Sequence, residues 1–321
     1  MSECYLIVTH SGRIRCLLDK FRSDINKKIG KLGNWGSLVL SFDVDGNITI
    51  QVLSSGVKSK KIKNMDKVNI PKRDDKGFDW WKDKRLYIVR HGVASHNVLK
   101  TKGKTSISGV PDAIMGTINK SSQSINGMKD TGLVEFGEHH NVKDVKTTVD
   151  NVNGHLGVNK INTLFSSDLL RTRQTMYHLL NNGLKIEFGK HKIHVVPCSH
   201  EVAYTTFTSC DYHYTTAMEN LVNPKSTDPF KCNRLFTVDW SYYDKFYKNK
   251  WSGSRRNRMH FTGNKCNNTN MMTGIMKIIE RENPPVKKGG SVYTKRKYRG
   301  TRRKSKKRKK SISKKSTFKK Y

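Results

Sequence analysis

Short apolar runs that end at polar or basic residues recur along the chain, and each predicts a buried strand. The first run, residues 5–8, leads into His10. The second, residues 86–89, leads into Arg90 and His91. Two later runs have the same character and cover residues 161–165 and 193–196. The sequence therefore predicts several strands that are covered on both faces.

Apolar residues at helical spacing follow the first and third runs. They are Ile14, Leu17, Leu18 and Phe21 in one case, and Leu169, Met176, Leu179 and Leu180 in the other. Ser166, Ser167 and Asp168 precede the second set and are suited to capping a helix N-terminus. A late helix is predicted near residues 271–280, and a β-hairpin over residues 38–53 with Asp45-Gly46-Asn47 at its tip. Because strands alternate with helices, we expect an α/β fold, a three-layer α/β/α sandwich with a mainly parallel sheet.

Polar segments interrupt this pattern in three places. Residues 54–85 are Lys-rich with little periodicity and predict a linker, and residues 101–130 predict a long loop. Residues 287–321 hold 18 Lys and Arg and no acidic residue. Such a tail has too few apolar side chains to form a core, so we expect it to be disordered when it is free.

The net charge indicates polyanionic partners. The chain of 321 residues carries a formal charge of +36, and without the tail 44 basic residues still face 26 acidic ones. We therefore expect a phosphorylated substrate and, through the tail, nonspecific contact with nucleic acid.

The cysteines and the apolar runs predict the compartment. Six scattered cysteines without a C-x-x-C pair are typical of reduced thiols in an intracellular protein: Cys4, Cys16, Cys198, Cys210, Cys232 and Cys266. No apolar run is long enough for a signal peptide or a membrane helix, so no membrane partner is expected. We expect a soluble cytoplasmic or nuclear protein. The abundant Lys and Asn and the basic tail are similar to those of large DNA virus proteins, which adds association with a virion as an option.

Basic and imidazole side chains follow three of the predicted strands. They are His10, then Arg90 with His91, and Arg171 one helical turn after the third strand. Ligands of parallel α/β sheets bind at the carboxyl ends of the strands. Guanidinium groups bind phosphate through two parallel hydrogen bonds, and an imidazole can accept a phosphoryl group and pass it to water. We therefore expect a phosphate site that helix N-termini also face.

Four motifs resemble those of the histidine phosphatase superfamily, which includes the phosphoglycerate mutases. Val89-Arg90-His91-Gly92, with Asn97 beyond it, resembles the R-H-G signature, and residues 166–175 are similar to the second arginine motif. Residues 197–201 are similar to the segment that bears the acidic proton donor. Residues 8–18, V-T-H-S-G-R-I-R-C-L-L, are similar to the last motif of the family.

The order of these motifs implies a circular permutation, because the element that usually comes last stands first. The resemblance divides residues 1–286 into a second-histidine segment (1–53), a linker (54–85) and the R-H-G segment (86–286), with the basic tail at 287–321. It implies a phosphoglycerate mutase-like fold, in which the strands before His10 and His91 are parallel neighbours. Termini that lie close together make such a permutation physically permissible.

The resemblance also implies roles for single residues. His91 would be the phosphorylated nucleophile, while Arg90, Arg171 and His10 would hold the phosphate. Asn97 would add a hydrogen bond, and Glu201 would protonate the leaving oxygen. The implied activity is that of a phosphomonoester phosphatase without a cofactor. Val93 stands where many members carry Glu, and Ser11 stands in place of a glycine; both departures bear on the substrate class.

Several alternatives stay open on the sequence alone. The chain could be a mutase, or an inactive phosphatase fold that binds nucleic acid or phosphorylated ligands, and its oligomeric state is open. Arg173 is expected on the helix surface in an ion pair. The set His191, His194, Cys198 and His200 fits no common zinc finger, and a strand would place the first two on opposite faces, so no metal is expected.

Overall fold

A computed structural model describes most of the first 283 residues. The described residues are 2–21, 24–57, 68–70, 76–94, 133, 139–189, 192–199, 236–247 and 268–283. Contacts divide the chain into two units, Met1–Asn283 and Pro284–Tyr321, and every described residue belongs to the first. The predicted loop over residues 101–130 and the predicted tail lie outside the described residues, as does the proposed domain boundary at residue 286.

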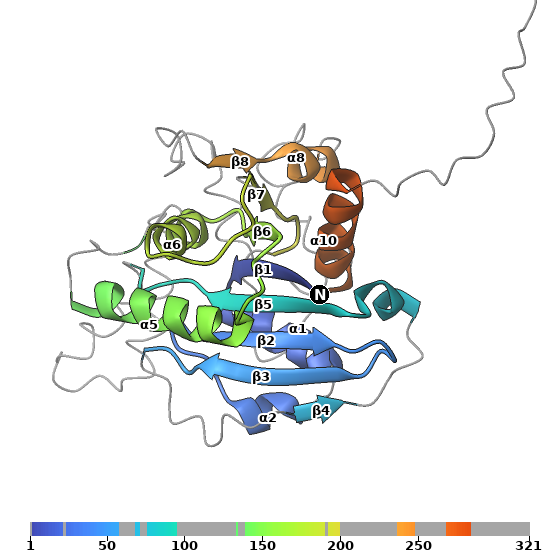
Figure 1. Ribbon diagram of the computed structural model, residues 1–321, viewed down its shortest axis with the longest axis horizontal. Coiled ribbons are helices and arrows are strands. Elements are labelled where there is room, and N and C mark those ends of the chain that lie inside the picture. The colour runs from blue at the N-terminus through green and yellow to red at the C-terminus, as the bar shows by residue number, and fades with distance from the viewer. Residues whose placement is uncertain are drawn as a thin grey trace, which may run out of the picture. The chain divides into compact units, whose positions relative to one another are not determined.

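The described strands form one mixed sheet of eight strands, most of which are parallel (Figure 1). The strands are β1 (Glu3–Thr9), β2 (Ser37–Phe42), β3 (Ile48–Ser54), β4 (Val68–Ile70), β5 (Lys84–Arg90), β6 (Thr163–Ser166), β7 (Lys192–Val195) and β8 (Thr237–Asp239). Their order is β4-β3-β2-β5-β1-β6-β7-β8. Strands β5, β1, β6, β7 and β8 are parallel, whereas β2, β3 and β4 add an antiparallel edge.

Helices cover both faces of the sheet, so the fold is α/β, as predicted. The helices are α1 (Ser11–Phe21), α2 (Ile25–Ile29), the 3-10 helix η1 (Lys76–Trp81), α5 (His139–Leu156), α6 (Leu170–Asn181), α8 (Ser241–Tyr247) and α10 (Asn268–Glu282). Successive β1 side chains point to opposite faces. Tyr5 and Ile7 pack in one core with α1 and α10, whereas Leu6 and Val8 pack in a second core with α5 and α6. Burial on both faces explains why β1 is apolar from Cys4 to Val8.

The predicted pairing of the first and second strands is confirmed. Strand β1 lies beside β5 in parallel, with Val8 opposite Val89 and Thr9 opposite Arg90. The predicted hairpin is also confirmed as β2 and β3, and Gly46 at its tip adopts a φ of 90°. The linker prediction for residues 54–85 is wrong in part. β4 joins the sheet edge there, and η1 ends in Trp81, which is buried among the rings of Tyr5 and Phe42.

The predicted reduced state is corrected for two of the six cysteines, while Cys210, Cys232 and Cys266 lie outside the described residues. Cys16 and Cys198 are disulfide-bonded, while Cys4 is a free and buried thiol. Scattered spacing carries no information on pairing, because pairing depends on which sulfur atoms the fold brings together. The expected intracellular location therefore loses the support of reduced thiols. Among the described residues, no helix has both the length and the apolar character needed to cross a membrane.

Candidate active site

The carboxyl ends of β1, β5 and β6 meet at one edge of the sheet, and His10, Arg90, His91 and Arg171 lie there. His10 follows β1 and His91 follows β5, and their ring centroids are 5.1 Å apart. Backbone hydrogen bonds continue past the strands, from His91 N to Thr9 O at 3.1 Å and from Ser167 N to Val8 O at 3.0 Å. The sheet ladder thus fixes the spacing of the two histidines.

The hydrogen bonds of His91 define which ring nitrogen carries the proton. Its Nδ1 lies 2.7 Å from the carbonyl oxygen of Gly92, which can only accept a hydrogen bond. Nδ1 therefore carries the hydrogen, and the amide nitrogen of Asn34, 3.5 Å from Nδ1, is a neighbour and not its donor. Nε2 keeps its lone pair and accepts a hydrogen bond from Arg171 Nε at 3.4 Å. This tautomer leaves Nε2 available as a nucleophile.

A loop after α2 holds the backbone that carries His91. Asn34 donates from its side chain to the carbonyl oxygens of His91 (3.1 Å) and Gly92 (2.7 Å). Trp35, which has a φ of 62°, packs its ring against Gly92 and donates from Nε1 to Asn141 Oδ1 at 2.7 Å. The same Asn141 oxygen accepts the backbone N–H of Val93. Sequence reasoning missed these three supporting side chains.

The second histidine is held from the turn between β6 and α6. His10 Nε2 lies 3.0 Å from Ser167 Oγ, and Ser167 in turn donates to Asp168 Oδ1 at 2.9 Å. The predicted N-cap is corrected: the N-cap residue of α6 is Leu169, whose side chain makes no cap hydrogen bond, and the Asp168 carboxylate accepts from Ser167 and from Tyr243. The carboxylate is therefore part of the histidine's surroundings.

The two arginines that the sequence singled out reach the site in different ways. Arg171, in the first turn of α6, is buried and contacts His91. Arg90 ends β5 and donates from Nη1 to the carbonyl oxygen of Leu32 at 2.6 Å, so part of its guanidinium supports the neighbouring loop. Asn97 and Glu201 lie outside the described residues, so their predicted roles stay predictions.

Arg173 is not the surface residue that the sequence predicted. Its side chain is fully buried, and its guanidinium lies 5.2 Å from the ring centroid of Trp240. The residue faces away from Arg171 because positions two apart on a helix do not share a face. The segment that begins α8 covers it.

Helix N-termini add positive potential at the same edge of the sheet. Helix α1 begins directly after His10 and α6 begins shortly after β6, and neither first turn holds an acidic side chain. The first N–H groups of a helix lack intrahelical partners, and the helix dipole favours an anion there. Combined with Arg171 and two imidazoles, this edge is suited to a phosphate group.

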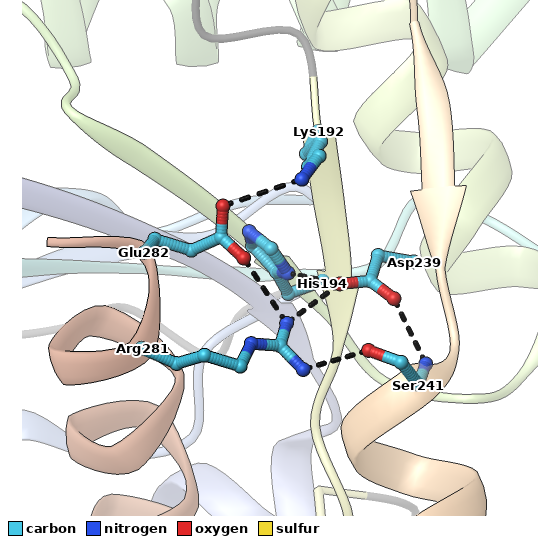
Figure 2. Close-up of polar contacts among 6 residues, drawn as sticks. All are labelled: Lys192, His194, Asp239, Ser241, Arg281 and Glu282. Carbon is cyan, nitrogen blue, oxygen red and sulfur yellow. Dashed lines mark hydrogen bonds and ion pairs between the residues drawn. The ribbon is translucent and has the colours of Figure 1, made fainter. Parts of the chain in front are cut away.

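A second polar cluster lies where α10 meets β7, β8 and α8 (Figure 2). His194, Asp239 and Glu282 form the group, among the residues that the structure describes, whose ligand atoms could share a metal ion. The Arg281 guanidinium, however, donates to Asp239 at 2.7 Å and to Glu282 at 3.2 Å, and Lys192 pairs with Glu282 at 3.4 Å. These cations already neutralise both carboxylates, so the residues do not fit a metal centre.

The same contacts determine the pKa shifts of His194 and Asp239 in this cluster. Burial lowers the pKa of His194, although the neighbouring Asp239 carboxylate partly offsets this effect. Burial alone would raise the pKa of Asp239, but hydrogen bonds from Ser241 and the charges of His194 and Arg281 outweigh it and hold that pKa at about 2. The cluster ties the edge of the sheet to α8 and α10. The sequence shows no zinc-binding pattern for His191, His194, Cys198 and His200; His191 and His200 lie outside the described residues, and Cys198 is disulfide-bonded.

Comparisons with protein-family models, with curated proteins and with solved structures find no match for this chain.

Proposed function

We propose that this chain is a phosphomonoester phosphatase that forms a phosphohistidine at His91. The main support for this proposal is the hydrogen bonding of the His91 ring. Its Nδ1–H donates to the Gly92 carbonyl oxygen, and its Nε2 accepts a hydrogen bond from the Arg171 guanidinium. The ring of the second histidine, His10, lies beside it. A nucleophilic nitrogen beside a phosphate-binding group is the minimum that phosphoryl transfer to histidine requires.

The proposed reaction has two steps. In the first, the His91 Nε2 lone pair attacks phosphorus and the ester P–O bond breaks, so that the leaving oxygen takes a proton from an acid. In the second, water attacks phosphorus, the P–N bond returns its electron pair to Nε2, and the water proton passes to the same acid's conjugate base. Arg171 and His10 stabilise the charge on the phosphoryl oxygens in both steps. Glu201 is the proposed acid, on the sequence resemblance.

Two features support the family resemblance as part of the proposal. A circularly permuted histidine phosphatase requires the strands before His10 and His91 to be parallel neighbours, and β1 and β5 have that arrangement. The Ser166-to-Thr175 motif lies at the same edge, with Thr175 Oγ1 accepting the backbone N–H of Gly92 at 2.9 Å. We infer a phosphoglycerate mutase-like sheet on these grounds.

The test is hydrolysis of an aryl phosphate by the full chain with EDTA present. His91→Ala should lower the rate by roughly 10³-fold or more. His178→Gln, a change near the far end of α6, serves as the matched control and should stay within about twofold of wild type. Acid-labile, alkali-stable radiolabel on the wild type, absent from His91→Ala, would identify the intermediate. Equal rates for wild type and His91→Ala would end the proposal.

We also propose that residues 287–321 contact nucleic acid. Their 18 Lys and Arg without any acidic residue are the feature that favours this second function. Contacts of this kind release counterions from nucleic-acid phosphates, so they are independent of sequence and weaken steeply with salt. They would be additional to the reaction at His91.

A further inference from the structure

We propose that Ser167, Asp168 and Tyr243 are positioning residues that fix the proton of the second histidine, His10, on its Nε2 atom. The position of this proton follows from the hydrogen-bond geometry alone. Its consequence for catalysis rests on the proposed phosphatase function.

A continuous chain of hydrogen bonds leads from α8 to His10. The Tyr243 hydroxyl donates to Asp168 Oδ2 at 2.8 Å, and the Ser167 hydroxyl donates to Asp168 Oδ1 at 2.9 Å. Ser167 Oγ lies 3.0 Å from His10 Nε2. All four side chains are at most 2 % exposed, so water does not compete for these bonds. Burial away from water strengthens each of these hydrogen bonds.

The donor and the acceptor in each of these hydrogen bonds follow from the chemistry of the side chains. An ionised carboxylate only accepts hydrogen bonds, so both hydroxyl groups donate to Asp168. Ser167 has one hydroxyl hydrogen, and it is used toward Asp168. The Ser167 oxygen can therefore only accept from His10, which makes Nε2 the donor. Asp168 also polarises the Ser167 hydroxyl, which strengthens that oxygen as an acceptor.

The two histidines are thereby held in opposite protonation patterns. His91 carries its hydrogen on Nδ1, so its Nε2 is unprotonated and accepts a hydrogen bond from Arg171, as a nucleophilic nitrogen beside a phosphate ligand requires. His10 carries a hydrogen on Nε2, with a buried carboxylate one hydroxyl group away. With its Nε2 hydrogen directed at Ser167, a His10 ring that also carried a proton on Nδ1 could donate to a phosphoryl oxygen. Identical side chains thus receive different roles from their neighbours, as in other sites where two titratable groups are set apart by environment.

The placement of Asp168 argues against a purely local role. Asp168 accepts from Ser167 through Oδ1 and from Tyr243 through Oδ2, while the N-cap residue of α6 is Leu169. A fully buried carboxylate is costly unless it is well hydrogen-bonded. Here the second donor, Tyr243, comes from a distant part of the chain.

The polar cluster of Figure 2 fixes the helix that supplies this donor. Asp239 accepts the backbone N–H of Ser241 at 2.8 Å at the start of α8, and Arg281 donates to both Asp239 and the Ser241 hydroxyl at 2.7 Å. Trp240 then packs edge-on against Tyr243, with ring centroids 5.3 Å apart. The cluster therefore positions Tyr243, and through it the Asp168 carboxylate.

The decisive experiment is long-range proton–nitrogen NMR of the histidine rings in the full chain, with signals assigned through His10→Gln and His91→Gln. We expect the wild type to show Nε2–H for His10 and Nδ1–H for His91. Ser167→Ala and Asp168→Asn should give a mixture of tautomers at His10 and leave His91 unchanged. Asp150→Asn, on the exposed face of α5, is the matched control and should change neither ring. Wild-type His10 protonated on Nδ1 alone, or an unchanged His10 in both variants, would overturn the proposal.

Kinetics then separates this proposal from the phosphatase proposal. Ser167→Ala and Asp168→Asn should lower kcat by about 10- to 100-fold, the equivalent of one hydrogen bond to a charged group, with a smaller change in KM. Tyr243→Phe should lower kcat by about 3- to 10-fold, while its neighbour Tyr242→Phe should stay within about twofold of wild type. If His91→Ala abolishes hydrolysis and these variants do not affect it, the positioning role fails and the phosphatase stands. If no hydrolysis occurs at all, the NMR result still decides the proton on His10.

Discussion

Gly92→Ala should damage both the stability and the proposed activity of the protein. A Cβ atom at position 92 would lie 2.5 Å from Cζ2 and 2.6 Å from Cε2 of the Trp35 ring. Carbon atoms in contact need about 3.5–4.0 Å, so the ring or the backbone must move by about 1 Å. The indole is fully buried and its Nε1 donates to Asn141, so it has little room to move.

The cost can be worked from these contacts. Overpacking in a well-packed core costs about 1–3 kcal/mol, and loss of the Trp35–Asn141 hydrogen bond would add about 1 kcal/mol. If the backbone of Gly92 moves instead, its carbonyl oxygen no longer holds His91 Nδ1 in place. A displacement of about 1 Å at a reacting group can cost about 10²-fold in rate.

Thermal unfolding and aryl phosphate hydrolysis would measure the two effects. Gly154→Ala is the matched control, because nothing lies within 4 Å of its new Cβ and the residue sits in α5. That change should stabilise the helix by up to about 1 kcal/mol. Trp35→Phe should partly rescue Gly92→Ala, with a coupling of about 0.5–3 kcal/mol in a double-mutant cycle. A neutral Gly92→Ala variant, or strict additivity with Trp35→Phe, would refute the packing argument.

Three further predictions address titration, phosphate binding and the tail. Burial lowers the pKa of His178 to about 4, below its unfolded value of about 6.5. Because the unfolded chain binds this proton more readily, the free energy of unfolding should be greatest above pH 6.5 and fall by up to about 3 kcal/mol toward pH 4. His178→Gln should flatten that profile in thermal unfolding scans. Arg171→Lys keeps the charge but loses the guanidinium fork, so kcat/KM should fall by the equivalent of about 1–3 kcal/mol, and an unchanged value would mean that Arg171 does not contact phosphate. Deletion of residues 287–321 should leave hydrolysis within about twofold and flatten the salt dependence of nucleic-acid binding; an unchanged salt slope would place the contact elsewhere.

The neighbouring positions of His10 and His91 could be predicted from the sequence because local pattern and sheet geometry agree. Two uniformly apolar runs, each ending at a histidine, must both be buried in the sheet. Parallel strands place their carboxyl ends at one edge, so side chains that follow them meet. The same reasoning placed Arg171, since a helix that returns from a parallel strand begins at that edge.

The supports of the site could not be predicted, because they come from segments without a pattern of their own. Asn34 and Trp35 stand in a short loop whose hydrogen bonds reach 58 and 106 positions along the chain. Nothing local marks an Asn or a Trp in such a loop as a partner of the R-H-G turn. Only the antiparallel addition of β2 to β5 brings this loop beside His91.

Asp168 shows how a correct local rule can fail for a physical reason. Ser-Ser-Asp before a helix is good capping chemistry, yet the N-cap residue of α6 is Leu169. The Asp168 carboxylate accepts from two hydroxyl groups, one of Ser167 and one of Tyr243, which lies 75 positions away. Because the site is fully buried, a carboxylate satisfied by hydroxyl donors on both oxygens costs less than one left partly unpaired. The fold therefore places the Asp168 charge near the second histidine. Substitution of Asp168 should separate a role in positioning His10 from a role in capping α6.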